Sequence, residues 1–137
     1  MMKYFLAKTD PETYSIDDLE RDKKTVWDGV KNPQALRAIR EMQPGDKVFV
    51  YHSMGDPQVV GLAEVASAPR PDPKNPKLTV VDFAFAGRLD PPVSLTEIKA
   101  SHQFDDWALV RQSRLSTMPA PEAFVQWMRR KCPTAKI

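Results

Sequence analysis

Residues that build disulfides, metal sites and nucleotide-binding loops are scarce in this sequence of 137 residues, which has one cysteine, two histidines and five glycines. A single Cys132 excludes an internal disulfide framework and any zinc site built from several cysteines. His52 and His102 lie far apart in the sequence, so they give little support to a histidine-rich metal centre. The sequence patterns of P-loops, dinucleotide folds and nucleophile elbows are also absent. We therefore expect neither a metal nor a cofactor.

Long apolar runs are missing as well. No stretch approaches the roughly 20 apolar residues that a membrane helix needs. Residues 1–10 are too short and too soon charged to act as a signal peptide. We therefore expect a soluble protein of the cytoplasm that has no membrane partner.

The sequence also lacks a large excess of charge. Its 20 lysines and arginines face 18 aspartates and glutamates, which leaves a net charge of +2. A protein that held nucleic acid mainly by releasing counterions would carry a larger positive excess. Local chemistry would have to supply much of the affinity for any nucleic acid. The 13 prolines against 5 glycines indicate stiff loops between short elements.

What is present indicates one mixed domain over residues 1–137. The 42% hydrophobic and 28% charged residues are ordinary for a globular chain, and the length suits one domain. Apolar stretches predict strands at residues 4–7, 47–52, 59–65 and 78–85, and the second and third of these form an antiparallel pair across a turn.

Between and after these strands lie residues typical of helix starts. Helices are predicted after Ser15, Asn32 and Ser94, and a last one from about Pro121. Residues 27–31 are expected to form a loop, residues 69–76 a stiff exposed crossing, and Pro44 to end the second helix. These elements predict an α+β fold, an open, strongly bent, mostly antiparallel β-barrel or sheet with flanking helices.

Several ordered motifs resemble those of one known family. They are WDGVKN at residues 27–32, YHS at 51–53 and RLS at 114–116, preceded by KTDP at 8–11. In this order they resemble the EVE domain family, a branch of the PUA-like superfamily. The chain departs from the family where Lys31 replaces an arginine, Pro33 a tyrosine and Phe5 a tryptophan. Lysine lacks the planar guanidinium of arginine, which can donate two parallel hydrogen bonds. The change at residue 31 therefore alters how a phosphate or a carbonyl edge is held.

The resemblance implies a PUA-like barrel that binds nucleic acid without catalysis. Similar domains include the YTH readers of methylated adenine in RNA. For this chain the resemblance implies a modified cytosine or a related base, in DNA or RNA, flipped into an aromatic and polar pocket. Any downstream action would then need a separate effector protein.

A flipped base needs an aromatic face, polar groups at its edge and cations for the flanking phosphates. The residues expected to form the base pocket are Trp27, Gly29, Val30, Asn32, Tyr51, His52, Ser53, Leu115 and Ser116. Those expected at the phosphate-binding rim are Lys8, Thr9, Lys31, Arg37, Arg40 and Arg114.

Several of these residues also have a purely structural interpretation. Trp27 suits a core anchor, Asn32 a helix cap, and His52 a hydrogen-bonded structural histidine. Arg114 suits an ion pair with a carboxylate such as that of Asp82. Tyr51 and His52 alternate along a strand, so only one of them can face a given pocket.

Two other functions remain open at this stage. An enzyme of the PUA-like ASCH type, acting on RNA or a nucleotide, would use Lys8, Tyr51, His52 and Arg114 for acid–base and phosphate chemistry. A regulatory domain would hold a peptide or small metabolite in the cleft, and a cleft without a positive rim would favour it.

Overall fold

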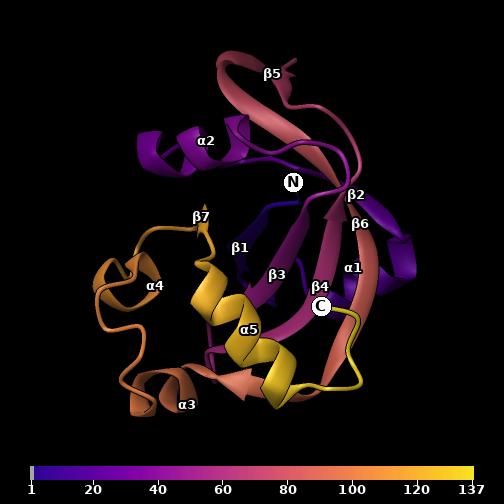
Figure 1. The fold of residues 1–137 in the computed structure, drawn as a ribbon. Helices are drawn as coiled ribbons and strands as arrows, with labels where there is room; N and C mark the ends of the chain where they lie inside the picture. The colour runs from indigo at the N-terminus through magenta and orange to yellow at the C-terminus, as the bar shows by residue number, and fades with distance from the viewer. Residues whose placement is uncertain (1) are drawn as a thin grey trace.

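A bent sheet organises the molecule (Figure 1). The computed structural model describes residues 2–137. In the sheet the strands follow the order β2-β6-β4-β3-β1-β7, and β5 pairs with β6 outside this path. The strands are β1 (Tyr4–Thr9), β2 (Lys24–Trp27), β3 (Lys47–His52), β4 (Gln58–Val65), β5 (Arg70–Asp72), β6 (Asn75–Ser94) and β7 (Thr117–Pro119).

The sheet curls without closing. β1 pairs in parallel with β3, and the other described pairs are antiparallel. At its two ends, β2 pairs with β6 and β7 pairs with β1, and neither end strand has a second partner within residues 2–137. Irregular register between β4 and β6, after Val59 and after Leu62, interrupts the ladder where the sheet bends. The open side of the sheet therefore lies between β2 and β7.

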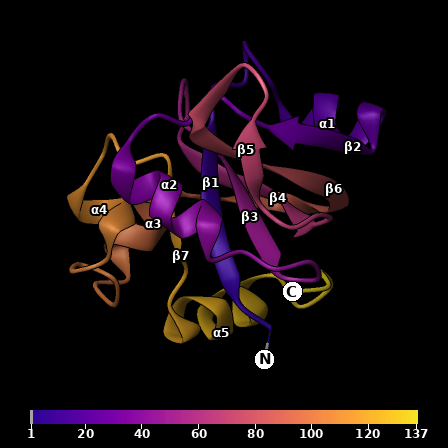
Figure 2. The same ribbon diagram turned by 90° about the horizontal axis from the view of Figure 1, so that it is seen from above.

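Five helices are described around the sheet: α1 (Ile16–Asp22), α2 (Pro33–Arg40), α3 (Leu95–Ala100), α4 (Ala108–Arg111) and α5 (Glu122–Lys131). Seen from above, α1 and β2 lie on the side of the molecule away from α5 (Figure 2). Phe124 of α5 packs edge-on against Phe49 of β3, with 5.2 Å between ring centroids. The same ring contacts Phe104 and Trp127, so α5 joins the sheet core through an aromatic cluster. No helix in residues 2–137 combines the length and apolar character needed to cross a membrane.

Local signals in the sequence placed most elements correctly. The helix starts predicted at Ser15 and Ser94 are confirmed, and each is a capping box: Ser15 and Asp18 exchange hydrogen bonds at the start of α1, and Ser94 and Glu97 do so at the start of α3. Asn32 caps α2 as predicted, and the antiparallel pairing of β3 with β4 is confirmed. The predicted α+β class with a bent, open sheet is therefore correct.

Other predictions of local structure were wrong. Residues 69–76 do not form a crossing but contribute to the β5–β6 hairpin, in which Pro71 pairs with Thr79. Proline is tolerated there because β5 is an edge strand. Trp27 ends strand β2 and does not begin a loop, and α2 ends at Arg40, before Pro44. The strand predicted at residues 78–85 extends on both sides and becomes the 20-residue β6.

Candidate functional site

A cavity of about 640 Å³ opens between the two unpaired ends of the sheet. Three parts of the chain line it: the end of β1 with the following turn, β2 with the loop to α2, and the segment before β7. The lining residues are Lys8, Thr9, Asp10, Thr13, Tyr14, Thr25, Val26, Trp27, Asp28, Gly29, Val30, Lys31, Asn32, Arg114 and Ser116. The cavity thus exists because the sheet stays open at this point.

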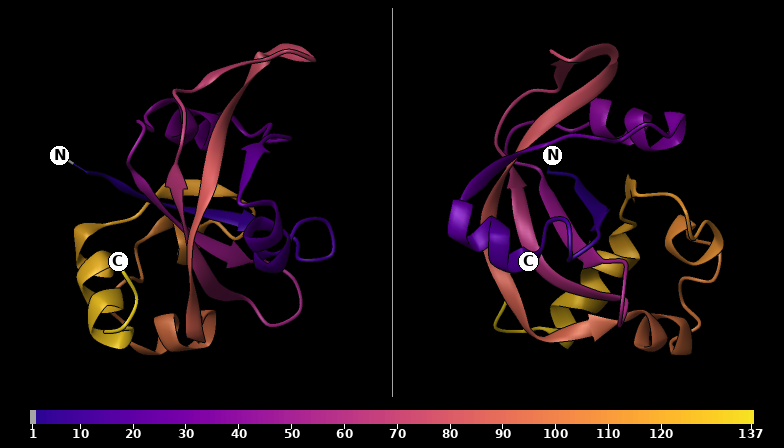
Figure 3. Two further views of the ribbon diagram at one scale, coloured as in Figure 1. Left: turned by 90° about the vertical axis from the view of Figure 1, so that its right-hand side faces the viewer. Right: turned by 180° about the vertical axis from the view of Figure 1, so that it is seen from behind.

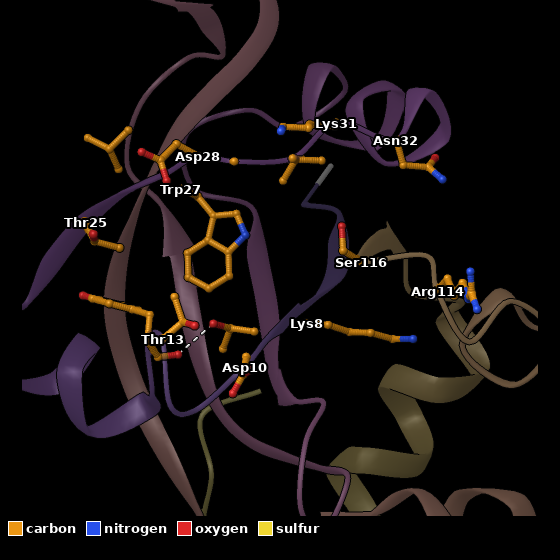
Figure 4. A pocket seen from close by; sticks show the side chains of 15 residues that line it. Lys8, Asp10, Thr13, Thr25, Trp27, Asp28, Lys31, Asn32, Arg114 and Ser116 are labelled. Atoms are coloured by element: carbon orange, nitrogen blue, oxygen red, sulfur yellow. Dashed lines mark hydrogen bonds between the residues drawn. The ribbon is translucent and has the colours of Figure 1, made fainter. Parts of the chain in front are cut away.

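Trp27 forms part of both the core and the cavity wall. Its side chain is central among the lining residues (Figure 4), although only 8% of the residue is exposed. On the core side its ring packs against Phe83 at 4.9 Å between centroids, and it makes a T-shaped contact with Tyr14 at 6.3 Å between centroids. These contacts hold the indole in a fixed position, which lowers the entropic cost of presenting an aromatic face. The two interpretations of Trp27 are therefore compatible.

Asn32 likewise combines a structural contact with a place in the cavity. Its Oδ1 accepts hydrogen bonds from the backbone N–H groups of Gln34 at 2.8 Å and Ala35 at 3.2 Å. The cap occupies the side-chain oxygen and leaves the amide NH2 group as a donor. The loop that leads to the cap turns at Gly29, whose φ of 76° favours glycine. Helix capping and the glycine turn together hold residues 29–32 at the cavity wall.

Lys8 points away from Trp27, toward the segment that carries Arg114 (Figure 4). Its Nζ donates a hydrogen bond to the carbonyl oxygen of Ser113 at 3.0 Å and lies 5.7 Å from the centre of the Tyr51 ring. Its backbone N–H donates to the carbonyl oxygen of Ser116 at 2.7 Å. Burial lowers the pKa of the Lys8 ammonium group. Lys8 therefore fastens residues 113–116 to the end of β1, a role that sequence analysis missed.

Positive groups exceed negative groups on the cavity lining. Lys8, Lys31 and Arg114 stand against Asp10 and Asp28, and Asp10 accepts the backbone N–H of Glu12 at 2.9 Å. Arg114 has no carboxylate within salt-bridge distance in the described chain, residues 2–137. The cavity therefore has a positive rim that can face phosphates.

The alternative interpretation of Arg114, an ion pair with a carboxylate such as that of Asp82, was wrong. One carboxylate oxygen of Asp82 accepts from Arg70 at 2.9 Å, and the other lies 3.9 Å from Lys24. This pair sits in the β5–β6 hairpin and beside β2. No carboxylate of residues 2–137 thus neutralises the guanidinium group of Arg114, which is available to a ligand.

The YHS motif lies outside the cavity lining, contrary to the sequence-based placement. Tyr51 is buried, which raises its pKa to about 12. His52 accepts the backbone N–H of Ile16 through Nε2 at 3.1 Å, and burial lowers its pKa. Ser53 donates its backbone N–H to the carbonyl oxygen of Thr9 at 3.0 Å. The motif therefore braces the end of β1 and the start of α1 from behind.

Three further predicted residues also lie outside the cavity lining. Leu115 is only 3% exposed and belongs to the core, because its neighbours Arg114 and Ser116 take the cavity side. Arg37 and Arg40 extend from the exposed side of α2. Arg40 donates through Nε to the hydroxyl of Thr79 at 3.0 Å. The predicted pocket residues Trp27, Gly29, Val30, Asn32 and Ser116 and the predicted rim residues Lys8, Thr9, Lys31 and Arg114 do line one cavity.

Sequence analysis missed six residues of the lining: Asp10, Thr13, Tyr14, Thr25, Val26 and Asp28. The first three follow Lys8 and Thr9 around the turn after β1, and Asp28 follows Trp27, so proximity to a family motif was the available signal. Thr25 and Val26 were missed because β2 was not predicted. Among residues 2–137, no group of three or more histidine, cysteine, aspartate and glutamate residues is placed to hold a metal ion.

The unclosed sheet, its flanking helices and the cavity at the open side define a PUA-like domain. The sequence profile of the EVE domain family matches residues 3–131. The chain belongs to the EVE domain family.

Relatives with this fold are known from several organisms. Thymocyte nuclear protein 1 of Rattus norvegicus is 31% identical to this chain, with 87% of this chain and 69% of the relative aligned. The structure of Rpa0253 from Rhodopseudomonas palustris matches with a TM-score of 0.90 and 31% identity, over 96% of this chain and 94% of that protein. The human THYN1 protein in complex with DNA containing 5-methylcytosine matches with a TM-score of 0.86 and 26% identity, over 94% and 96%. The chain is homologous to thymocyte nuclear protein 1.

Proposed function

We propose that this protein is a non-enzymatic reader of DNA that takes a modified base, 5-methylcytosine or a related pyrimidine, into the cavity beside Trp27. The observation that carries the proposal is the meeting of one fixed indole with unpaired cations at the mouth of a single cavity. The homologous human THYN1 protein in complex with 5-methylcytosine-containing DNA supports the choice of DNA and of this modification.

The size and lining of the cavity suit one nucleotide unit. Small-ligand pockets span about 300 to 1,000 Å³, and this cavity has about 640 Å³. Extruding a base from a duplex costs a few kcal/mol, and stacking on an aromatic side chain returns about 1 to 3 kcal/mol. Stacking on Trp27 therefore offsets much of the extrusion cost.

The polar lining gives the base edge its partners. The amide NH2 group of Asn32 is a donor, and the hydroxyl of Ser116 is both donor and acceptor. Lys31 and Arg114 then meet the phosphates that flank the extruded nucleotide. This division of roles fits a protein of small net charge, because selectivity comes from the cavity and few phosphates need to be held.

The positions of Tyr51 and His52 favour a reader over an ASCH-like enzyme. An acid–base mechanism needs these groups within hydrogen-bond reach of the substrate, and neither lines the cavity. The Nε2 lone pair of His52 is also occupied by the backbone N–H of Ile16. Tyr51 and His52 therefore do not share the cavity with Lys8 and Arg114, although the Lys8 ammonium group lies over the Tyr51 ring.

Binding to matched oligonucleotides tests the proposal. Calorimetry would compare short single strands and duplexes that carry one central 5-methylcytosine, cytosine or thymine, together with RNA carrying 5-methylcytosine. We expect the methylated DNA to bind most tightly. Equal affinity for cytosine and 5-methylcytosine would overturn the proposed modification, and stronger binding of the RNA would overturn the choice of DNA.

A further inference from the structure

The arginines of this protein divide into two groups by their partners. Arg21, Arg70, Arg88 and Arg111 each bind a carboxylate. Arg37, Arg40, Arg114 and Arg130 bind none within the described residues 2–137, and Arg129 donates to the main-chain oxygen of Ile137. Several lysines, among them Lys31 and Lys77, also lack a salt bridge there. Neutralised cations contribute little to an external field, so the cations of the second group are the ones available to an anion.

The cations of α2 lie in one row on its exposed side. Arg37 and Arg40 are three residues apart and exposed, whereas Leu36 and Ile39 beside them are buried. Lys31 stands just before the helix, at the cavity. With a rise of about 1.5 Å per residue, Arg40 lies about 12 Å along the helix axis from the Asn32 cap. The row therefore leads away from the cavity mouth.

The β5–β6 hairpin continues this row. It projects beyond the rest of the sheet beside α2, as Figure 3 shows from two sides. Arg40 joins the two elements through its hydrogen bond to Thr79. Lys77 is exposed and lies only two residues before Thr79 in β6, where the β5–β6 register is irregular. Two residues of chain span at most about 7 Å, so Lys77 lies close to the point where Arg40 meets the hairpin.

We propose that the row Lys31, Arg37, Arg40 and Lys77 is a second contact surface, which binds the phosphate backbone of the DNA strand whose base enters the cavity. The inference rests on the proposed function, because the cavity supplies the point from which the strand starts. Stacked DNA advances about 3.4 Å per nucleotide on each strand, so the helical part of the row spans three to four nucleotides. Contacts to phosphates position a strand without reading its sequence, so this surface would hold the strand without selecting its bases.

The variant Arg37→Ala/Lys77→Ala tests the surface without disturbing the fold. Neither side chain makes a described hydrogen bond or salt bridge within residues 2–137, whereas Arg40 is kept because it bonds to Thr79. The matched control is Lys99→Ala/Arg130→Ala, which removes two exposed cations from α3 and α5 at the opposite end of the molecule (Figure 1). Each lost phosphate contact on a single strand lowers the slope of log K against log salt by about 0.7, and weakens binding about fivefold at ~0.1 M salt.

For the double variant we therefore expect a slope lower by about 1.4 and binding about 25-fold weaker at ~0.1 M salt. Its affinity ratio between methylated and unmethylated oligonucleotides should stay at the wild-type value, and the control should match the wild type throughout. A wild-type slope in the double variant would overturn the second surface and leave the reader intact. A lower slope combined with no preference for the methylated base, in the wild type as well, would support the surface and overturn the reader. A changed affinity ratio in the double variant alone would place these cations in the base site and overturn a separate surface.

Discussion

Replacing Trp27 by leucine separates its contribution to binding from its contribution to stability. Leucine keeps apolar volume against Phe83 but removes the aromatic face that lines the cavity. Losing one base–aromatic stack costs about 1 to 3 kcal/mol, which at 1.4 kcal/mol per tenfold is a weakening of roughly 5- to 150-fold. The variant also loses packing, with a stability cost below the roughly 3 to 5 kcal/mol of a full truncation of tryptophan to alanine. Calorimetric titration with methylated oligonucleotide measures the first effect, and urea unfolding the second.

A second tryptophan supplies the control for this experiment. Trp127 of α5 is 7% exposed against 8% for Trp27, and it packs on aromatic rings in the same way. It does not line the cavity. Trp127→Leu should therefore lower the free energy of unfolding by a similar amount while leaving the dissociation constant unchanged. Equal affinities for Trp27→Leu and the wild type, or an equal loss of affinity in both variants, would refute the assignment of Trp27 to the base site.

Three further predictions concern the local structure. Asn32→Ala should lower the free energy of unfolding by about 1 kcal/mol, whereas Asn32→Ser keeps the cap and loses only the amide. Weaker oligonucleotide binding by the serine variant at unchanged stability would therefore show that the amide contacts the base. The pKa of His52 is held below its ordinary 6.5 by burial, so the unfolded chain takes up a proton first as the pH falls. Stability should therefore drop below about pH 6.5 in the wild type and less in His52→Gln, and parallel pH profiles in urea unfolding would contradict this. A Cβ at Gly61 would lie 2.5 Å from a side-chain carbon of Ile16 and 2.8 Å from the carbonyl oxygen of Gly87. Gly61→Ala should therefore cost about 1 to 3 kcal/mol, while Gly87→Ala, where no atom lies within 4 Å, should leave the melting temperature nearly unchanged.

Interactions between near neighbours in the chain could be predicted from the sequence. The capping boxes of α1 and α3 and the cap at Asn32 each join residues two or three positions apart. Residue type and spacing are then sufficient, because the backbone geometry of a helix start is always the same. The ordered motifs also predicted the family, and with it the open, bent sheet.

Prolines and short polar strands limited that prediction. Pro71 was assigned to a loop, but it sits on an edge strand that does not need its missing N–H. β2 has four residues, of which only Trp27 is buried, so its pattern resembles a loop until β6 pairs with it. Strand pairing with a distant partner determined both elements, and no local pattern reports it.

The sequence by itself determined the starts of α1, α2, α3 and α5, the family and most of the side chains that line the cavity. Only the tertiary structure decided which residues of the family motifs face the cavity: Tyr51, His52 and Ser53 brace it from behind, and Leu115 enters the core between two residues that line it. It also showed that Lys8 holds the carbonyl oxygen of Ser113, 105 positions away in the chain. The physical reason is that the cavity forms between the two unpaired ends of an unclosed sheet, β2 and β7. The positions of these ends depend on the pairing of strands that are distant in the sequence.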